Sequence, residues 1–74
     1  MRTFEDAGGR RWDVAVSAES YGTQRLIFAA RADSELRASG LELSSRLEAE
    51  QLLLRLSDNE LRALLAAAPL WQPE

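Results

Sequence analysis

The stretch Thr3–Ala18, TFEDAGGRRWDVAVSA, carries the pattern of a β-hairpin. Apolar side chains alternate with polar or small ones in its second half, at Trp12, Val14 and Val16. This period of two is typical of a half-buried strand. Gly8 and Gly9 precede the run and favour a turn, because glycine tolerates positive φ. Residues 3–5 then predict a short first strand that pairs with the second.

The next run, residues 24–32, predicts a third strand with two distinct faces. One face carries Leu26, Phe28 and Ala30, and the other carries Arg25, Ile27, Ala29 and Arg31. Residues 36–43 could form a fourth strand, but their apolar pattern is mixed. In a regular strand, Leu36 and Ala38 would point to one face, while Leu41 and Leu43 would point to the opposite face. A β-bulge at Gly40 would return both of the later leucines to the core face.

Two amphipathic helices are predicted in the C-terminal half. Apolar residues recur there at the spacing i, i+3, i+4, i+7, first at Ala49, Leu52, Leu53 and Leu56, then at Leu61, Leu64, Leu65 and Ala68. Ser45 with Glu48, and Ser57 with Glu60, have the spacing of a capping box at each helix start. Pro69 ends the second helix, since proline lacks the backbone N–H that a helix interior needs.

These patterns together predict a single α+β domain, a three- to four-stranded antiparallel meander with two C-terminal helices packed on one face. The expected bounds are about 2–6, 10–18 and 24–32 for the strands, with 36–43 as the open fourth, and about 45–56 and 58–68 for the helices. Residues 69–74 are expected to form a tail too short for another element.

The chain has 74 residues and contains neither cysteine nor histidine. Disulfides and thiolate metal sites are therefore excluded, and the commonest zinc ligand and general base are missing. Carboxylates such as Asp33 with Glu35, and Glu48 with Glu50, have the spacing of solvated surface charges. No phosphate-binding glycine loop follows Gly8 and Gly9. We therefore expect no catalytic residues, no bound metal and no cofactor. The protein is expected not to be an enzyme.

The basic residues are nine arginines, and the net charge is −3. Arg11, Arg25 and Arg31 fall on the strand faces opposite the expected core, with Arg10 and Arg37 nearby and Ile27 among them. This arginine face suggests one alternative function, a small nucleic-acid-associated or transcription-regulating protein. The acidic C-terminal half and Asp13 on the same face oppose binding to phosphate backbones, so nucleic acid is the less favoured partner.

The favoured hypothesis is a protein–protein interaction module. Arginine and aromatic residues are enriched at interfaces, and the arginine face also carries Ile27. Trp71, which follows Pro69, is suited either to anchor a partner or to fold back onto the small core. Tyr21 lies beside Gly22, between the expected second and third strands. It too is suited either to contact a partner or to pack onto the core. Homodimerisation is a further alternative, because a thin core and a one-sided sheet leave apolar surface available.

No secretion signal or membrane-spanning run is evident in the sequence, so a cytoplasmic location is expected. Four short motifs, Phe4-x-Asp6, Gly9-Arg10-Arg11-Trp12, Tyr21-Gly22 and Leu56-Ser57-Asp58-Asn59-Glu60-Leu61-Arg62, resemble those of short uncharacterised proteins of GC-rich bacteria. The motifs are turns, a strand and a capped helix. The resemblance therefore implies a bacterial origin and carries no activity and no site residues.

Overall fold

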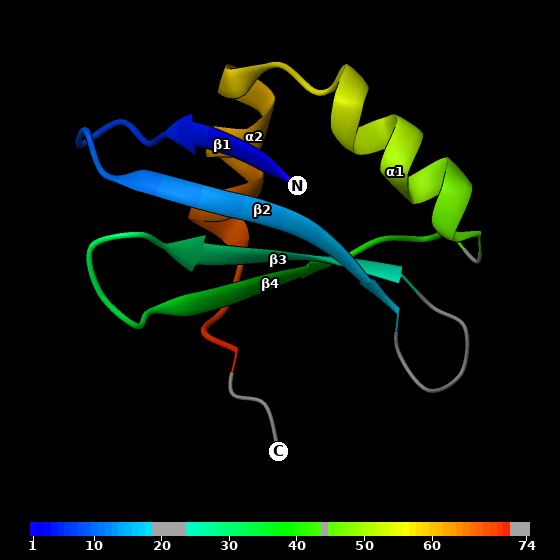
Figure 1. Cartoon of the computed structure of the whole chain (residues 1–74), viewed down its shortest axis with the longest axis horizontal. Helices are drawn as coiled ribbons and strands as arrows, with labels where there is room; N and C mark the ends of the chain where they lie inside the picture. Colours follow the sequence, from blue (N-terminus) through cyan, green and yellow to red (C-terminus); the bar gives the residue numbers. More distant parts are fainter. Residues whose placement is uncertain (19–23, 44, 72–74) are drawn as a thin grey trace.

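The described part of the chain folds into one four-stranded sheet with two helices. The computed structural model describes residues 1–18, 24–43 and 45–71. The elements are β1 (Arg2–Glu5), β2 (Arg11–Ala18), β3 (Gln24–Ala30), β4 (Leu36–Gly40), α1 (Arg46–Arg55) and α2 (Asp58–Ala67). All neighbouring strands are antiparallel and follow chain order across the sheet, β1-β2-β3-β4 (Figure 1). The predicted meander is confirmed, with the fourth strand present.

The two helices pack on the same face of the sheet, and α2 lies behind β1 and β2 in Figure 1. The shortest dimension of the molecule is 19 Å, which matches one sheet and one layer of helices, each about 10 Å thick. The other face of the sheet carries no described helix. The face without a described helix is the one that carries the candidate site.

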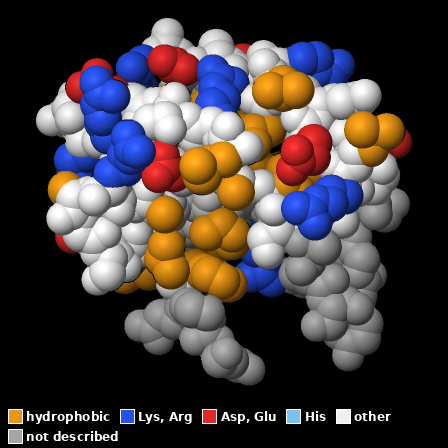
Figure 2. Space-filling view, viewed as in Figure 1, with side chains coloured by type: hydrophobic (Ala, Val, Ile, Leu, Met, Phe, Trp, Pro, Cys, Tyr) orange, Lys and Arg blue, Asp and Glu red, His pale blue; other side chains and the backbone are white. Residues whose placement is uncertain are grey.

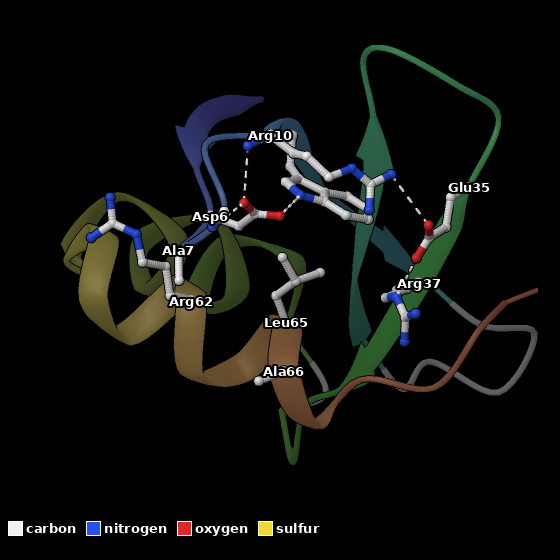
Figure 3. Close-up of a pocket in the computed structure, with 10 residues that line it drawn as sticks. Asp6, Ala7, Arg10, Glu35, Arg37, Arg62, Leu65 and Ala66 are labelled. Atoms are coloured by element: carbon white, nitrogen blue, oxygen red, sulfur yellow. Dashed lines mark hydrogen bonds and ion pairs between the residues drawn. The ribbon is translucent and has the colours of Figure 1, made fainter.

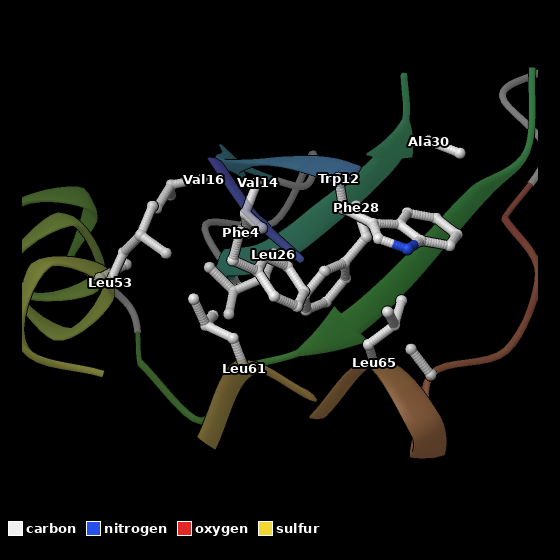
Figure 4. Close-up of a cluster of buried hydrophobic side chains, with 12 residues drawn as sticks. Phe4, Trp12, Val14, Val16, Leu26, Phe28, Ala30, Leu53, Leu61 and Leu65 are labelled. Carbon is white, nitrogen blue, oxygen red and sulfur yellow. The ribbon is translucent and has the colours of Figure 1, made fainter. Parts of the chain in front are cut away.

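The core lies between the sheet and the helices (Figure 4). Its fully buried side chains are those that the period of two and the helical stripes predict, with Trp12, Phe28, Leu26, Leu61 and Val14 the largest. The rings of Phe4 and Phe28 meet edge to face, with centroids 6.1 Å apart and planes at 75°. Such pairs are favourable because the positive ring edge faces the negative ring face.

The β1–β2 turn is organised by Asp6 as well as by glycine. Asp6 Oδ1 accepts the backbone N–H groups of Gly8 and Arg10, both at 2.9 Å. Gly9 has φ of 86°, a conformation that residues with a Cβ rarely adopt. The turn therefore uses the second glycine for its backbone and the aspartate for its hydrogen bonds.

Both edge strands turn an arginine toward the helix layer. Arg2, in β1, donates to the carbonyl oxygens of Leu53 and Leu56 at the end of α1. Arg37, in β4, donates from Nη1 to the carbonyl of Ala68 at 3.0 Å, just after α2. A cation beside the last carbonyls satisfies groups that have no partner within the helix. Inward-pointing charges on edge strands also oppose edge-to-edge aggregation.

The two helix starts differ in how fully they are capped. At α2, the Ser57 hydroxyl accepts from Glu60 N at 3.1 Å and the Glu60 carboxylate accepts from Ser57 N at 3.0 Å, the complete predicted capping box. At α1, Ser45 accepts from Glu48 N at 3.3 Å, and the reciprocal bond is not formed among the described residues. The capping box predicted for α1 is thus half present.

The fourth strand ends earlier than the predicted range of 36–43. Its pairing with β3 is regular from Leu36 to Gly40, and β4 ends at Gly40. The pairing becomes irregular only afterwards, where Gln24 accepts from Leu41 N and donates to the carbonyl of Leu43. Both leucines still pack against the core, through this irregular connection.

The first residues of the tail, 69–71, pair with β4. Leu70 forms an isolated antiparallel bridge with Arg37 of β4. Ala38 N donates to the carbonyl of Pro69 at 3.2 Å, and Trp71 N donates to the carbonyl of Leu36 at 2.9 Å. Residues 69–71 thus lie along the outer edge of β4, which the apolar pattern of the sequence could not indicate.

Candidate functional site

The open face of the sheet, which we define as the face away from α1 and α2, has an apolar centre. Ala15 of β2 lies opposite Ile27 of β3, which in turn lies opposite Ala38 of β4. The next row continues with Ala29 and Leu36. All five side chains are half-buried although both described helices lie on the other face. Figure 2 shows hydrophobic side chains gathered in the middle of this side, with charged side chains around them.

The three arginines predicted on this face have different partners. Arg31 Nε lies 3.4 Å from Asp13 Oδ2, so part of the positive charge is neutralised within the face. The Arg25 guanidinium lies 5.8 Å from the centre of the Trp71 ring, within the range of a cation–π contact. Arg11 is exposed at the start of β2. Arg25 and Ile27 thus lie on the same face of β3, two residues apart, while Arg31 lies just after the other end of this strand.

Arg10 and Arg37 do not extend this arginine face, which corrects the expectation that they lie beside it. The side chain of Arg37 alternates with those of Leu36 and Ala38, so it points to the helix side, where it reaches Ala68. Arg10 lies over the ring of Trp12, with its guanidinium carbon 4.9 Å from the ring centre. The basic surface is therefore smaller than predicted.

Trp71 is neither fully exposed, as a partner anchor would be, nor folded back into the core. It is half-buried and lies against Arg25 at the margin of the open face, outside the cluster of buried core residues. The ring therefore adds an aromatic side chain to the candidate site. Tyr21, the other predicted aromatic candidate, lies outside the described residues.

A second feature is a pocket of about 360 Å³ between the β1–β2 turn, the start of β4 and the last turns of α2, with charged side chains in its wall (Figure 3). Asp6 Oδ2 accepts the indole N–H of Trp12 at 2.8 Å. Glu35 accepts from Arg10 at 3.2 Å and from Arg37 at 2.6 Å. Arg10 also reaches Asp33 at 2.9 Å.

The carboxylates of this pocket are stabilised in their charged form. The pKa of Asp6 is lowered, mainly by the indole N–H of Trp12 and then by the backbone N–H of Arg10. The pKa of Glu35 is lowered, mainly by its bond to Arg37. A general base works best with a pKa near the working pH, and these shifts go the other way. The pocket network is thus suited to joining the turn, β4 and α2 rather than to proton transfer.

A third feature is a groove of about 310 Å³ between α1 and the connection that precedes it, lined in part by Leu41, Leu43 and Leu52. On the outer side of α1, Leu47 and Leu54 are 67% and 79% exposed. The leucines of α1 thus point in several directions, so its sequence gives a weaker amphipathic pattern than that of α2. The groove carries Glu42 and Glu48 with Arg55, a mixture without an evident ligand.

Within residues 1–18, 24–43 and 45–71, no three His, Cys, Asp or Glu side chains are placed to hold a metal ion. None of the helices described above could cross a membrane. Comparisons with protein-family models, curated proteins and solved structures find no match to this chain. The candidate site is therefore characterised by its geometry alone.

The pocket at the β1–β2 turn was not predicted from the sequence. One signal was available, because an aspartate just before a glycine turn commonly bonds to the backbone two residues on. The remaining contacts could not be predicted, since the pairing of Arg10 with Glu35 depends on how β2, β3 and β4 align. The bridge between Leu70 and Arg37 depends on how residues 69–71 lie along β4 after the end of α2.

Proposed function

We propose that this chain is a protein–protein interaction module without enzymatic activity, and that it presents the open face of its sheet to a protein partner. The observation that carries this proposal is the apolar row Ala15, Ile27 and Ala38 in the centre of that face. An antiparallel sheet with one solvated face normally alternates apolar and polar residues, with the polar ones outward. Here apolar and small residues hold the centre of both faces.

The surroundings of the row support a protein partner. Interface centres are depleted in charge, while tryptophan and arginine are enriched among the residues that contribute most to binding. The open face has this arrangement, with Trp71 and Arg25 at one margin and the Arg31–Asp13 pair toward the other end of β3. Desolvating the apolar centre would supply affinity, and the arginines would supply specificity.

The size of the face limits the expected affinity. The four strands have 4, 8, 7 and 5 residues. At about 3.3 Å per residue and about 4.8 Å between strands, they cover a projected area of roughly 400 Å². A standard interface buries about 800 Å² on each partner. The face alone is about half of that, so we expect either a transient complex or one in which the partner also contacts the tail.

Binding to single-stranded nucleic acid is the second candidate, favoured by one observation. Trp71 lies beside Arg25 on the same face as Arg11, a combination that could stack a base near a phosphate. The Arg31–Asp13 pair and the net charge of −3 oppose it. The two candidates differ in their response to salt, because phosphate contacts weaken steeply as the salt concentration rises.

The proposal is tested by affinity purification from cells that express the chain, after nuclease treatment. The Ile27→Asp variant places a charge in the centre of the apolar row, and Leu54→Asp places the same charge on exposed α1 as a matched control. We expect wild type and Leu54→Asp to retain the same proteins and Ile27→Asp to lose them. If all three forms of the chain retain the same proteins, the proposal is contradicted. It is also contradicted if the proteins recovered with the wild type are lost on nuclease treatment.

Self-association is the simplest form of this interaction and needs no unknown partner. Sedimentation velocity of the wild type from low to high micromolar concentration would detect a dimer. If a dimer forms, Ile27→Asp should dissociate it and Leu54→Asp should not. A wild type that stays monomeric directs the search to a different protein.

A further inference from the structure

We propose that the outer edge of β4, which does not pair with β3, is a binding site for an extended segment of a partner protein that carries an aromatic residue. In this structure the chain's own residues Pro69–Trp71 occupy that edge. This site is the backbone edge of the sheet, separate from the open face.

The strand register decides which backbone groups of β4 point outward. Ala30 N donates to the carbonyl of Glu35 at 3.0 Å, so residues 35, 37 and 39 exchange hydrogen bonds with β3. The N–H and C=O groups of the alternate residues, Leu36, Ala38 and Gly40, therefore point away from the sheet. A row of such groups is a ready template for pairing with another strand.

The tail already uses two groups of this row. It takes the N–H of Ala38 and the C=O of Leu36 in antiparallel pairing, as described above. Successive residues of an extended segment point to opposite faces, so Leu70 shares the face of Arg37 while Trp71 turns to Arg25 on the open face. The structure thus contains one example of the ligand that this edge accepts.

The tail is an incomplete occupant. Pro69 lies opposite Ala38 and has no N–H, so it cannot return a bond to the carbonyl of Ala38. Leu70 remains 64% exposed, so its side chain adds little buried surface. A segment with an ordinary residue in place of Pro69 would add a backbone hydrogen bond that the tail cannot make.

The other edge of the sheet is closed differently. Arg62 of α2 donates from Nε to the carbonyl of Glu5 at 2.7 Å, on the outer side of β1. The β1 strand has only four residues, and α2 packs against it. An arginine bond therefore blocks the edge of β1, whereas an exchangeable strand-like segment covers the edge of β4.

The competition between the tail and a second segment gives the test. A fluorescein-labelled peptide with the sequence of residues 67–74 is titrated with the full-length wild type and with full-length Trp71→Ala, and fluorescence anisotropy is measured. The variant loses the contact with Arg25, so its tail competes less. We expect the peptide to bind the variant roughly fivefold or more tightly than the wild type.

Two controls locate the binding at the edge. A peptide with alanine in place of its tryptophan should bind Trp71→Ala more weakly, because only the aromatic ring can replace the contact with Arg25. Adding Ala38→Pro should abolish binding, since it removes an N–H that points to the tail and not to β3. Proline is tolerated at such outward positions of edge strands.

NMR of the Trp71→Ala variant locates the bound peptide without the proline substitution, so it can be used even if the proline variant does not fold. Amide NMR signals of Leu36, Ala38 and Gly40 should shift on peptide addition, while that of Thr3 on the opposite edge should not. Equal affinity for wild type and Trp71→Ala would overturn the proposal, as would shifts confined to other strands. A wild-type dimer that Trp71→Ala dissociates would assign the site to the tail of a second copy and overturn it as well.

Discussion

At the scale of single residues, Asp6 joins the turn to the core. One carboxylate oxygen accepts the N–H groups of Gly8 and Arg10, and the other accepts the indole N–H of Trp12. Trp12 is 1% exposed, so its polar N–H needs a partner. Asp6 supplies that partner and fixes the geometry of the turn with the same side chain.

The Asp6→Asn substitution should destabilise the protein at neutral pH, because an amide is a weaker acceptor than a carboxylate for three N–H donors. The pKa of Asp6 is lowered in the folded state, so its contribution is present above its unfolded pKa of about 4 and is lost as the pH falls through the folded pKa. Urea midpoints measured from pH 7 to pH 2 should therefore converge for wild type and variant at low pH.

A constant difference between the two urea midpoints across that pH range would show that the charge of Asp6 contributes nothing. Glu60, whose pKa is lowered by the Ser57 backbone, serves as a second carboxylate for comparison. The Glu60→Gln variant should show convergence of the same sign, since it loses a hydrogen bond made by a charged group.

At the scale of the elements, the start of α2 is the best-specified helix end. Ser57→Ala should lower the free energy of unfolding by about 1 kcal/mol, because it leaves the N–H of Glu60 without its cap. Ser45→Ala at α1 is the matched control and should cost less, since the Ser45 bond is 3.3 Å long and has no reciprocal partner among the described residues. Urea unfolding measures both variants, and equal losses would contradict the difference between the two caps.

Packing of the helix layer can be tested with two leucines of opposite exposure. Leu61 in α2 is 0% exposed and Leu54 in α1 is 79% exposed. Leu61→Ala should cost about 2–5 kcal/mol, while Leu54→Ala should remain within about 0.5 kcal/mol of wild type. A domain of this length has a total stability of about 4–11 kcal/mol, so Leu61→Ala could unfold it.

Far-UV circular dichroism during urea titration distinguishes a weakened fold from a lost one. A small effect of Leu61→Ala, similar to that of Leu54→Ala, would mean that α2 does not pack on the sheet as described. A large effect of Leu54→Ala would instead indicate that the exposed face of α1 is covered in solution.

Most elements could be predicted because their signals are local. Alternation at Trp12, Val14 and Val16 and the stripe at Leu61 and Leu65 each depend on a few neighbouring residues. The end of β4 could not be predicted, since the phase change between Ala38 and Leu41 fits a bulge as well as an ended strand. Only the pairing with β3 decides between these two arrangements.

The candidate site could be predicted in part for the same reason. The positions of Arg25, Ile27 and Arg31 follow from alternation within one strand. The bond of Arg37 to the carbonyl of Ala68 requires the packing of β4 against α2. The contact between Trp71 and Arg25 joins residues far apart in the sequence, so no local pattern could indicate it.

At the scale of the whole molecule, charge and apolar surface are distributed unequally between the two sides. The helices and the connection before α1 carry most of the C-terminal acids, while the open face carries three arginines around an apolar row. The two sides of the molecule therefore differ in charge, and the open face combines arginines with an apolar centre. We therefore expect a partner to approach the sheet and not the helices.

The most direct test of the proposed function is site-specific photocrosslinking in cells that express the chain. A benzophenone amino acid is introduced at position 27 on the open face or at position 54 on α1, and adducts are identified by mass spectrometry after irradiation. We expect a discrete protein adduct, or a dimer of the chain itself, from position 27 and none from position 54. Adducts from position 54 alone, or nucleic-acid adducts from position 27, would contradict the proposed function.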